Sequence, residues 1–121
     1  GLVDISLLAL YASAYFDERG PDMRARRQHY IDRSPPSLGW SGQLHACIHS
    51  DTLDRLGDIA VPTFVTGSDL DLIAPTYYAE EIAAGIPGAR LHLLTGTGHV
   101  ALIERPEEFA RLCHEFLRGL H

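Results

Sequence analysis

Two residues of the sequence, Asp71 and His99, have the types and positions to do chemistry together. Each follows a short apolar run that we expect to form a buried strand, residues 60–66 before Asp71 and residues 90–94 before His99. A carboxylate beside an imidazole fixes the tautomer of the ring and favours its protonated form, as a general base requires. Taken singly, each residue is also a common loop residue, the aspartate as a turn former or helix cap and the histidine as a solvated side chain.

The elements around these residues would bring them together. A helix with Ala79, Ile82 and Ala83 on its inner face is predicted between the two strands, and Gly85 ends it. Strand, helix and strand in this order form a parallel unit with a right-handed crossover. Because the ends of parallel strands meet at one edge of a sheet, where ligands bind, we expect an α/β fold with Asp71 and His99 in one crevice.

The rest of the chain is predicted to be helical. Apolar residues at three- and four-residue steps predict one helix through Phe16, which Gly20-Pro21 would break. A polar helix at 23–31, a loop at 34–37 with Gly39, and short helices at 43–49 and 51–56 should follow.

A final helix should begin at Pro106. It carries an apolar stripe at helical spacing, made of Phe109, Leu112, Cys113, Phe116, Leu117 and Leu120. We therefore divide the chain into a helical segment, residues 1–57, and an α/β segment, residues 58–121.

Composition excludes several classes of protein. The chain has 121 residues and a net charge of −6, so neither nucleic acid nor an anionic membrane is expected as a partner. No apolar stretch is long enough to span a membrane, and the apolar start has no basic segment before it, so it does not resemble a secretory signal. Two cysteines, Cys47 and Cys113, cannot build a disulfide framework, and free thiols favour the cytoplasm.

No metal or other cofactor is expected. His45 and His49 lie four residues apart on a predicted helix, a spacing that can bind zinc, but Ala46 stands where the HExxH motif has glutamate, and no third ligand is evident.

Several motifs resemble the carboxyl-terminal part of the α/β-hydrolase superfamily. They are Val61-Pro62-Thr63 through Gly67, Asp71-x-x-x-Pro75, Ile86-Pro87-Gly88, Gly98-His99 and Glu104-Arg105-Pro106-Glu107-Glu108-Phe109. Residues 42–56 resemble the end of the helical cap in the branch of esterases and enol-lactone hydrolases. The resemblance covers about residues 38–120, and it implies that Asp71 is the acid and His99 the base of a catalytic triad.

Two departures from the family pattern stand out. The family usually places the triad aspartate three residues after the glycine that ends the strand, whereas Asp71 lies four residues after Gly67. Asp69 is therefore a second candidate for the acid. The second departure is the missing nucleophile: neither Ser41 nor Ser68 lies in a G-x-S-x-G elbow, and no oxyanion-hole segment is present.

We therefore expect this chain to be a fragment, a processed subunit or a truncated form, with its nucleophile on an amino-terminal half of the fold that lies before Gly1. That half, or a second copy of the chain, is the expected protein partner. The substrate would be a small ester, a lactone or a similar molecule, with Trp40 at its entrance and Val100 on the wall of its pocket.

Two other functions remain open. An aspartate nucleophile in the missing elbow would give an epoxide hydrolase or a dehalogenase, in which Asp71 and His99 activate water. A hydrolase-derived scaffold without catalytic activity is the other alternative, because one fold serves many functions.

Overall fold

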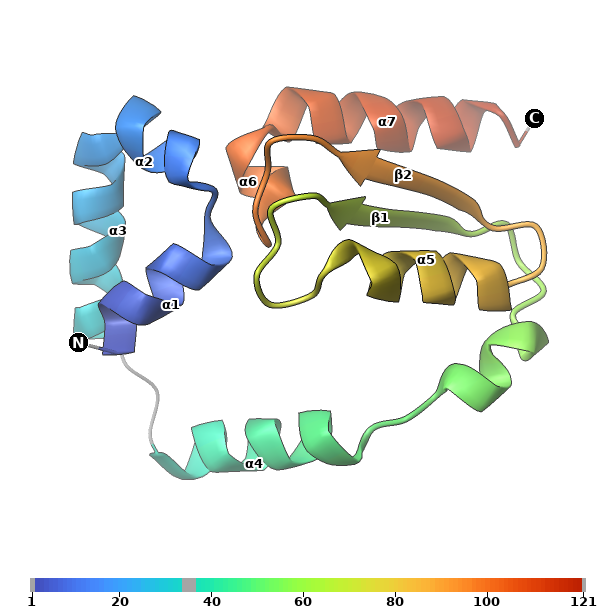
Figure 1. The fold of residues 1–121 in the computed structure, drawn as a ribbon, viewed down its shortest axis with the longest axis horizontal. Coiled ribbons are helices and arrows are strands. Elements are labelled where there is room, and N and C mark those ends of the chain that lie inside the picture. The colour runs from blue at the N-terminus through green and yellow to red at the C-terminus, as the bar shows by residue number, and fades with distance from the viewer. Residues whose placement is uncertain (1, 34–36, 121) are drawn as a thin grey trace.

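The computed structural model describes residues 2–33 and 37–120. The chain runs through four helices to a two-stranded unit and then to two more helices (Figure 1). The elements in chain order are α1 (Leu2–Leu10), α2 (Ser13–Glu18), α3 (Gly20–Asp32), α4 (Ser37–His49), the 3₁₀ helix η1 (Leu53–Asp58), β1 (Phe64–Ser68), α5 (Thr76–Gly85), β2 (Arg90–Leu94), α6 (Ala101–Glu104) and α7 (Pro106–Arg118).

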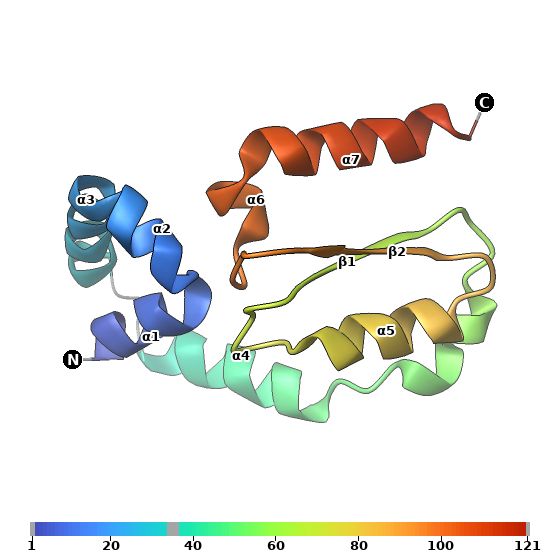
Figure 2. The same cartoon turned by 45° about the horizontal axis from the view of Figure 1, so that its top comes forward.

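The two strands form a parallel pair. Phe64 pairs with Arg90 at one end of the ladder and Ser68 pairs with Leu94 at the other, so both strands end at the same level. Helices α5 and α7 cover opposite faces of this sheet (Figure 2). The expected strand–helix–strand unit is thus present, and the fold is α/β.

The main core lies between the sheet and α7. Leu94 is 1% exposed and packs with Ala101 and Leu112, and the ring of Phe64 stacks on that of Phe116 with centroids 5.2 Å apart. The apolar stripe of α7 explains this packing, although Leu117 and Leu120 at its far end remain exposed.

On the other face of the sheet, α5 approaches β1 where the strand has no side chain. A Cβ atom at Gly67 would lie 2.9 Å from the Cβ of Ala79 and 3.0 Å from Cδ2 of Leu93. Glycine at this position therefore permits the close approach of helix and strand.

The amino-terminal helices form a second core cluster, made of Leu7, Tyr11 and Met23. The Arg27 guanidinium binds the Asp4 carboxylate, which ties α3 to α1 and holds the pKa of Asp4 well below its usual range. The single helix expected through Phe16 is wrong, because the chain leaves the helical conformation between α1 and α2. Ala12 is extended there, with φ −62° and ψ 145°, and its N–H donates to Glu104 instead of to a helical carbonyl.

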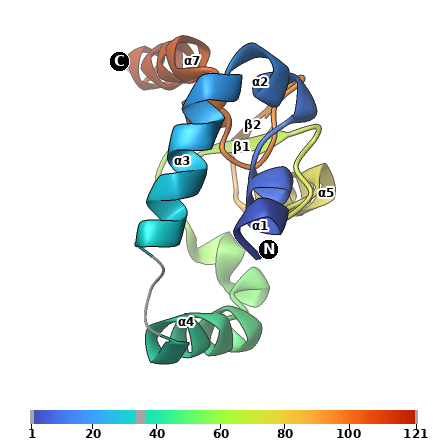
Figure 3. The same ribbon diagram turned by 90° about the vertical axis from the view of Figure 1, so that its left-hand side faces the viewer.

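Helix α4 differs from the prediction in its length. It begins at Ser37 and includes Gly39, so the loop expected there is wrong for these two residues, while residues 34–36 lie outside the described part. Trp40, Leu44 and Ile48 follow each other at four-residue steps and so lie on one face of this helix. All three side chains are more than half exposed on a helix that lies apart from the sheet (Figures 1 and 3).

Smaller differences concern the boundaries of other elements. The first strand begins at Phe64 rather than at residue 60, because Pro62 has no N–H to donate and the ladder starts with the bond from Arg90 N–H to the carbonyl of Thr63. The helix expected at 51–56 is a 3₁₀ helix displaced by two residues, and the short helix α6 was not predicted. No helix in the described ranges is both long and apolar enough to cross a membrane.

The contact at Gly67 gives a stability prediction. Gly67→Ala should lower the free energy of unfolding by about 1–3 kcal/mol, because the added methyl group overpacks the junction of β1 and α5. Urea denaturation measures this change. The matched control is Gly57→Ala, where a Cβ meets no atom within 4 Å and the change should stay within about 0.5 kcal/mol. Equal stabilities for the two variants would contradict the packing described here.

Candidate active site

Asp71 and His99 meet beyond the ends of the two strands. Asp71 lies in the loop after β1 and His99 in the loop after β2, and Nδ1 of His99 lies 2.9 Å from Oδ2 of Asp71. The Asp71 side chain is only 8% exposed, whereas the His99 side chain is 37% exposed. The carboxylate thus lies behind the ring, and the imidazole is the member of the pair that solvent or a ligand reaches.

The Asp71 carboxylate is held by its own loop. Oδ1 accepts hydrogen bonds from the N–H groups of Ile73, at 2.8 Å, and of Ala74, at 2.9 Å. With one oxygen committed to the backbone, only Oδ2 is left to face His99. A carboxylate fixed in this way can orient the imidazole and stabilise a positive charge on it.

Asp69, the second candidate for the acid, has a different partner. Its Oδ1 accepts a hydrogen bond of 2.7 Å from the N–H of Gly96, whose φ of +74° suits glycine. The N–H of Leu70 donates to the carbonyl of Thr97 in the same region. Asp69 therefore joins the two loops that carry Asp71 and His99.

A hollow of about 280 Å³ lies beside the pair. Asp71 and His99 line it together with mostly apolar residues of β1, α5, α6 and α7, among them Val65, Ala79, Ile82, Leu102 and Phe109. An imidazole at the rim of an apolar hollow can exchange a proton with a bound molecule, which is the geometry that general acid–base catalysis needs.

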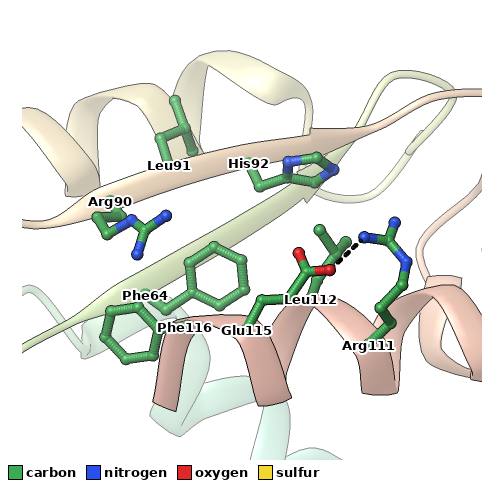
Figure 4. A pocket seen from close by; sticks show the side chains of 8 residues that line it. All are labelled: Phe64, Arg90, Leu91, His92, Arg111, Leu112, Glu115 and Phe116. Carbon is green, nitrogen blue, oxygen red and sulfur yellow. Dashed lines mark hydrogen bonds and ion pairs between the residues drawn. The ribbon is translucent and has the colours of Figure 1, made fainter. Parts of the chain in front are cut away.

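A second hollow, of about 330 Å³, lies between β2 and α7 and is separate from this pair (Figure 4). Its charged groups have partners within the chain. Arg111 Nη1 lies 2.8 Å from Glu115 Oε1, and the Arg90 guanidinium lies over the ring of Phe116 at 5.8 Å from its centroid. We therefore take the hollow beside Asp71 and His99 as the candidate site.

The residues predicted to contact substrate lie elsewhere. Trp40 is on α4, 60% exposed, and does not line the hollow beside His99. Val100 packs against the cluster of Leu7, Tyr11 and Met23. Ala101 and Leu102, the next two residues along the chain, line the hollow instead. The substrate contacts of Trp40 and Val100 stay predictions.

Within residues 2–33 and 37–120, no serine or cysteine side chain is hydrogen-bonded to His99, although Ser68 lines the same hollow. Ser68 is buried at the end of β1, Ser41 lies on α4, and neither forms a hydrogen bond with His99 in this part of the chain. The rings of His45 and His49 lie close together on exposed α4, with centroids 4.2 Å apart, but the described residues include no group of three metal-binding side chains.

Sequence reasoning gave no role to Glu104. Its carboxylate accepts two backbone hydrogen bonds beside His99. The available signal was an acidic residue directly after the apolar run at 100–103, where a partly buried charge needs partners.

Comparisons with known proteins show the family to which the chain belongs. The sequence matches the alpha/beta hydrolase family over residues 3–112, and the chain belongs to that family. It is 40% identical over 68 residues to the 2-hydroxy-6-oxo-6-phenylhexa-2,4-dienoate hydrolase of Comamonas testosteroni, a match that covers 56% of this chain and 24% of that protein. It is also 36% identical over 106 residues to the proline iminopeptidase of Lacticaseibacillus rhamnosus, covering 84% of this chain and 35% of that one.

Solved structures show the same relationship. The enol-lactonase of Burkholderia xenovorans LB400 superposes with a TM-score of 0.86 at 25% identity, covering 97% of this chain and 44% of that one. The esterase of Thermogutta terrifontis superposes with a TM-score of 0.84 at 25% identity, covering 99% and 44%. The chain thus has the carboxyl-terminal part of the α/β-hydrolase fold and spans less than half the length of the relatives it matches.

The contact between Nδ1 and Asp71 predicts which nitrogen of His99 carries hydrogen. In the neutral ring, Nδ1 should be protonated and donate to the carboxylate, which leaves Nε2 free as an acceptor. Long-range ¹H–¹⁵N NMR of the imidazole distinguishes the two tautomers. Asp69→Asn should leave the pattern unchanged, whereas Asp71→Asn should change it. A dominant Nε2–H form in the unsubstituted protein would contradict the assignment.

Proposed function

We propose that this chain supplies the acid and the base of a Ser-His-Asp triad in a hydrolase of small esters or lactones. The observation that carries the proposal is the 2.9 Å contact between Nδ1 of His99 and the buried carboxylate of Asp71. Hydrolase relatives of the same fold support it. The finer assignment of ester or lactone substrates is part of the proposal.

In this mechanism His99 moves the proton and Asp71 holds the ring. Nε2 of His99 takes the proton of a serine hydroxyl while the serine oxygen bonds to the carbonyl carbon of the substrate. The electron pair of the C=O double bond moves onto the carbonyl oxygen. When the ester bond breaks, the imidazolium returns the proton to the leaving alkoxide. Water then repeats the cycle on the acyl-enzyme, with His99 first as base and then as acid.

The nucleophile would come from outside residues 1–121. In the described residues β1 has a strand partner on one edge only, although parallel strands are normally part of a larger buried sheet. Leu72 and Leu102, next to the pair, are 73% and 57% exposed, so apolar surface at the site is uncovered. An amino-terminal half of the hydrolase fold would cover this surface and bring the serine to Nε2.

We assign residues 1–57 to the helical cap of that hydrolase and residues 58–121 to its core. The exposed stripe of Trp40, Leu44 and Ile48 on α4 supports a role in covering apolar surface, because a free helix with such a stripe is costly in water. In this arrangement Trp40 lies at the substrate entrance, and Val100 supports the pocket wall.

The assignment of His99 gives a kinetic prediction for a hydrolase polypeptide that contains this chain. His99→Ala should lower kcat for an ester substrate by at least about 10³-fold, because no other group then takes the serine proton. Thermal unfolding should change little, since the His99 side chain is partly exposed. Asp71→Asn should also lower kcat strongly, and Asp69→Asn much less. Wild-type turnover in His99→Ala would refute the proposed function.

The sequence has no G-x-S-x-G elbow, and this gives a labelling prediction. A fluorophosphonate probe should not label residues 1–121 alone but should label a serine once the remainder of the fold is present. Mass spectrometry of the labelled peptide locates the serine. Labelling of Ser41 or Ser68 would overturn the assignment. A complete hydrolase that turns over substrate without being labelled would instead favour an aspartate nucleophile.

A further inference from the structure

The backbone on both sides of His99 is attached to the junction between α1 and α2. On one side, the N–H of Val100 donates to the carbonyl of Leu10 at 3.1 Å. On the other side, the N–H of Gly98 donates to Oε1 of Glu104 at 3.1 Å, and the same oxygen accepts the N–H of Ala12 at 3.0 Å. The junction runs beside α6 and the loop before it (Figures 1 and 2).

Glu104 is the centre of this arrangement. Its side chain comes from the last residue of α6, is partly buried, and joins two backbone segments that are far apart in the sequence. Hydrogen bonds to a carboxylate are stronger than those between neutral groups, and a partly buried N–H that loses its acceptor is costly. Removing this one oxygen would leave both N–H groups without the partner they have here.

Gly98 allows the loop before His99 to lie directly against the α1–α2 junction. A Cβ atom at this position would lie 2.7 Å from the nitrogen of Ala12, 2.8 Å from the carbonyl carbon of Tyr11 and 2.9 Å from the carbonyl oxygen of Leu10. All three are backbone atoms, so a side chain could not be accommodated by a change of rotamer. The residue before His99 is therefore packed directly on the backbone of the α1–α2 junction.

The break between α1 and α2 makes these contacts possible. In a continuous helix the carbonyl of Leu10 and the N–H of Ala12 would both be used by intrahelical bonds. Because the helix is interrupted at this junction, these two groups are not used within it and bind Val100 and Glu104 instead. The interruption of the helix and the position of the His99 loop depend on each other.

We infer that Glu104 is a positioning residue for His99: its carboxylate couples the amino-terminal helices to the backbone that presents the imidazole. The inference rests on the proposed role of His99 as the base. Glu104 acts through the backbone of Gly98, so it should affect the rate of proton transfer more than the binding of substrate. The helices of residues 2–32 then take part in catalysis by holding the loop as well as by covering the site.

The test compares two substitutions of similar size in a hydrolase polypeptide that contains this chain. Glu104→Gln keeps an acceptor oxygen, and Glu104→Met removes it. Since a small misplacement of a reacting group can cost about 10²-fold in rate, Glu104→Met should lower kcat by about 10- to 100-fold with KM nearly unchanged. Glu104→Gln should lower kcat by only about two- to fivefold, because a neutral acceptor is weaker.

The control variant is Glu107→Met, which removes an exposed carboxylate from the first turn of α7 and should leave kcat and KM unchanged. Thermal unfolding is followed for every variant, and the kinetics are measured where each is fully folded. Rescue by glutamine at constant KM supports positioning. A wild-type kcat in folded Glu104→Met would overturn the inference. If Glu104→Met does not fold, a wild-type kcat in Glu104→Gln would overturn it.

The outcomes also separate this inference from the proposed function. If His99→Ala abolishes turnover while folded Glu104→Met keeps it, only the role of Glu104 is wrong. If His99→Ala keeps wild-type turnover, the proposed function itself fails, and with it the positioning role of Glu104.

Discussion

The parallel pairing of β1 with β2 is the constraint from which the candidate site follows. Because Ser68 pairs with Leu94, the two strands end at the same level and their loops start side by side. Asp69 and Leu70 then bond to the backbone of the second loop, and Asp71 lies within 2.9 Å of His99. A different register would separate the carboxylate from the ring, since a shift of one residue also exchanges the faces of a strand.

Three acidic residues at this edge of the sheet have different roles. Asp69 joins the two loops, Asp71 contacts the ring, and Glu104 binds the backbone next to His99. Each carboxylate accepts at least one backbone N–H, so each is fixed in place as well as charged. A site built on such bonds is held more precisely than one that depends on loop packing alone.

The sequence predicted the elements whose signal is local. The apolar run at 90–94 and the stripe after Pro106 correspond to β2 and α7, and the α/β-hydrolase family was recognisable from short motifs. The break at Ala12 was not predictable, because the acceptor that its N–H binds is a carboxylate 92 residues away. The glycines of α4 concealed that the helix begins at Ser37. The spacing of Asp69 from Gly67 could not show that its carboxylate accepts the N–H of Gly96.

The bond between Ala12 and Glu104 also has a consequence for the order of folding. Contacts between residues that are distant along the chain require the closure of a long loop, which slows their formation. The strands and α5 involve nearer neighbours and can form first. Docking of the amino-terminal helices onto the Gly98 loop would then be a late kinetic step, and a chain emerging from the ribosome could complete it only after α6 has been synthesised.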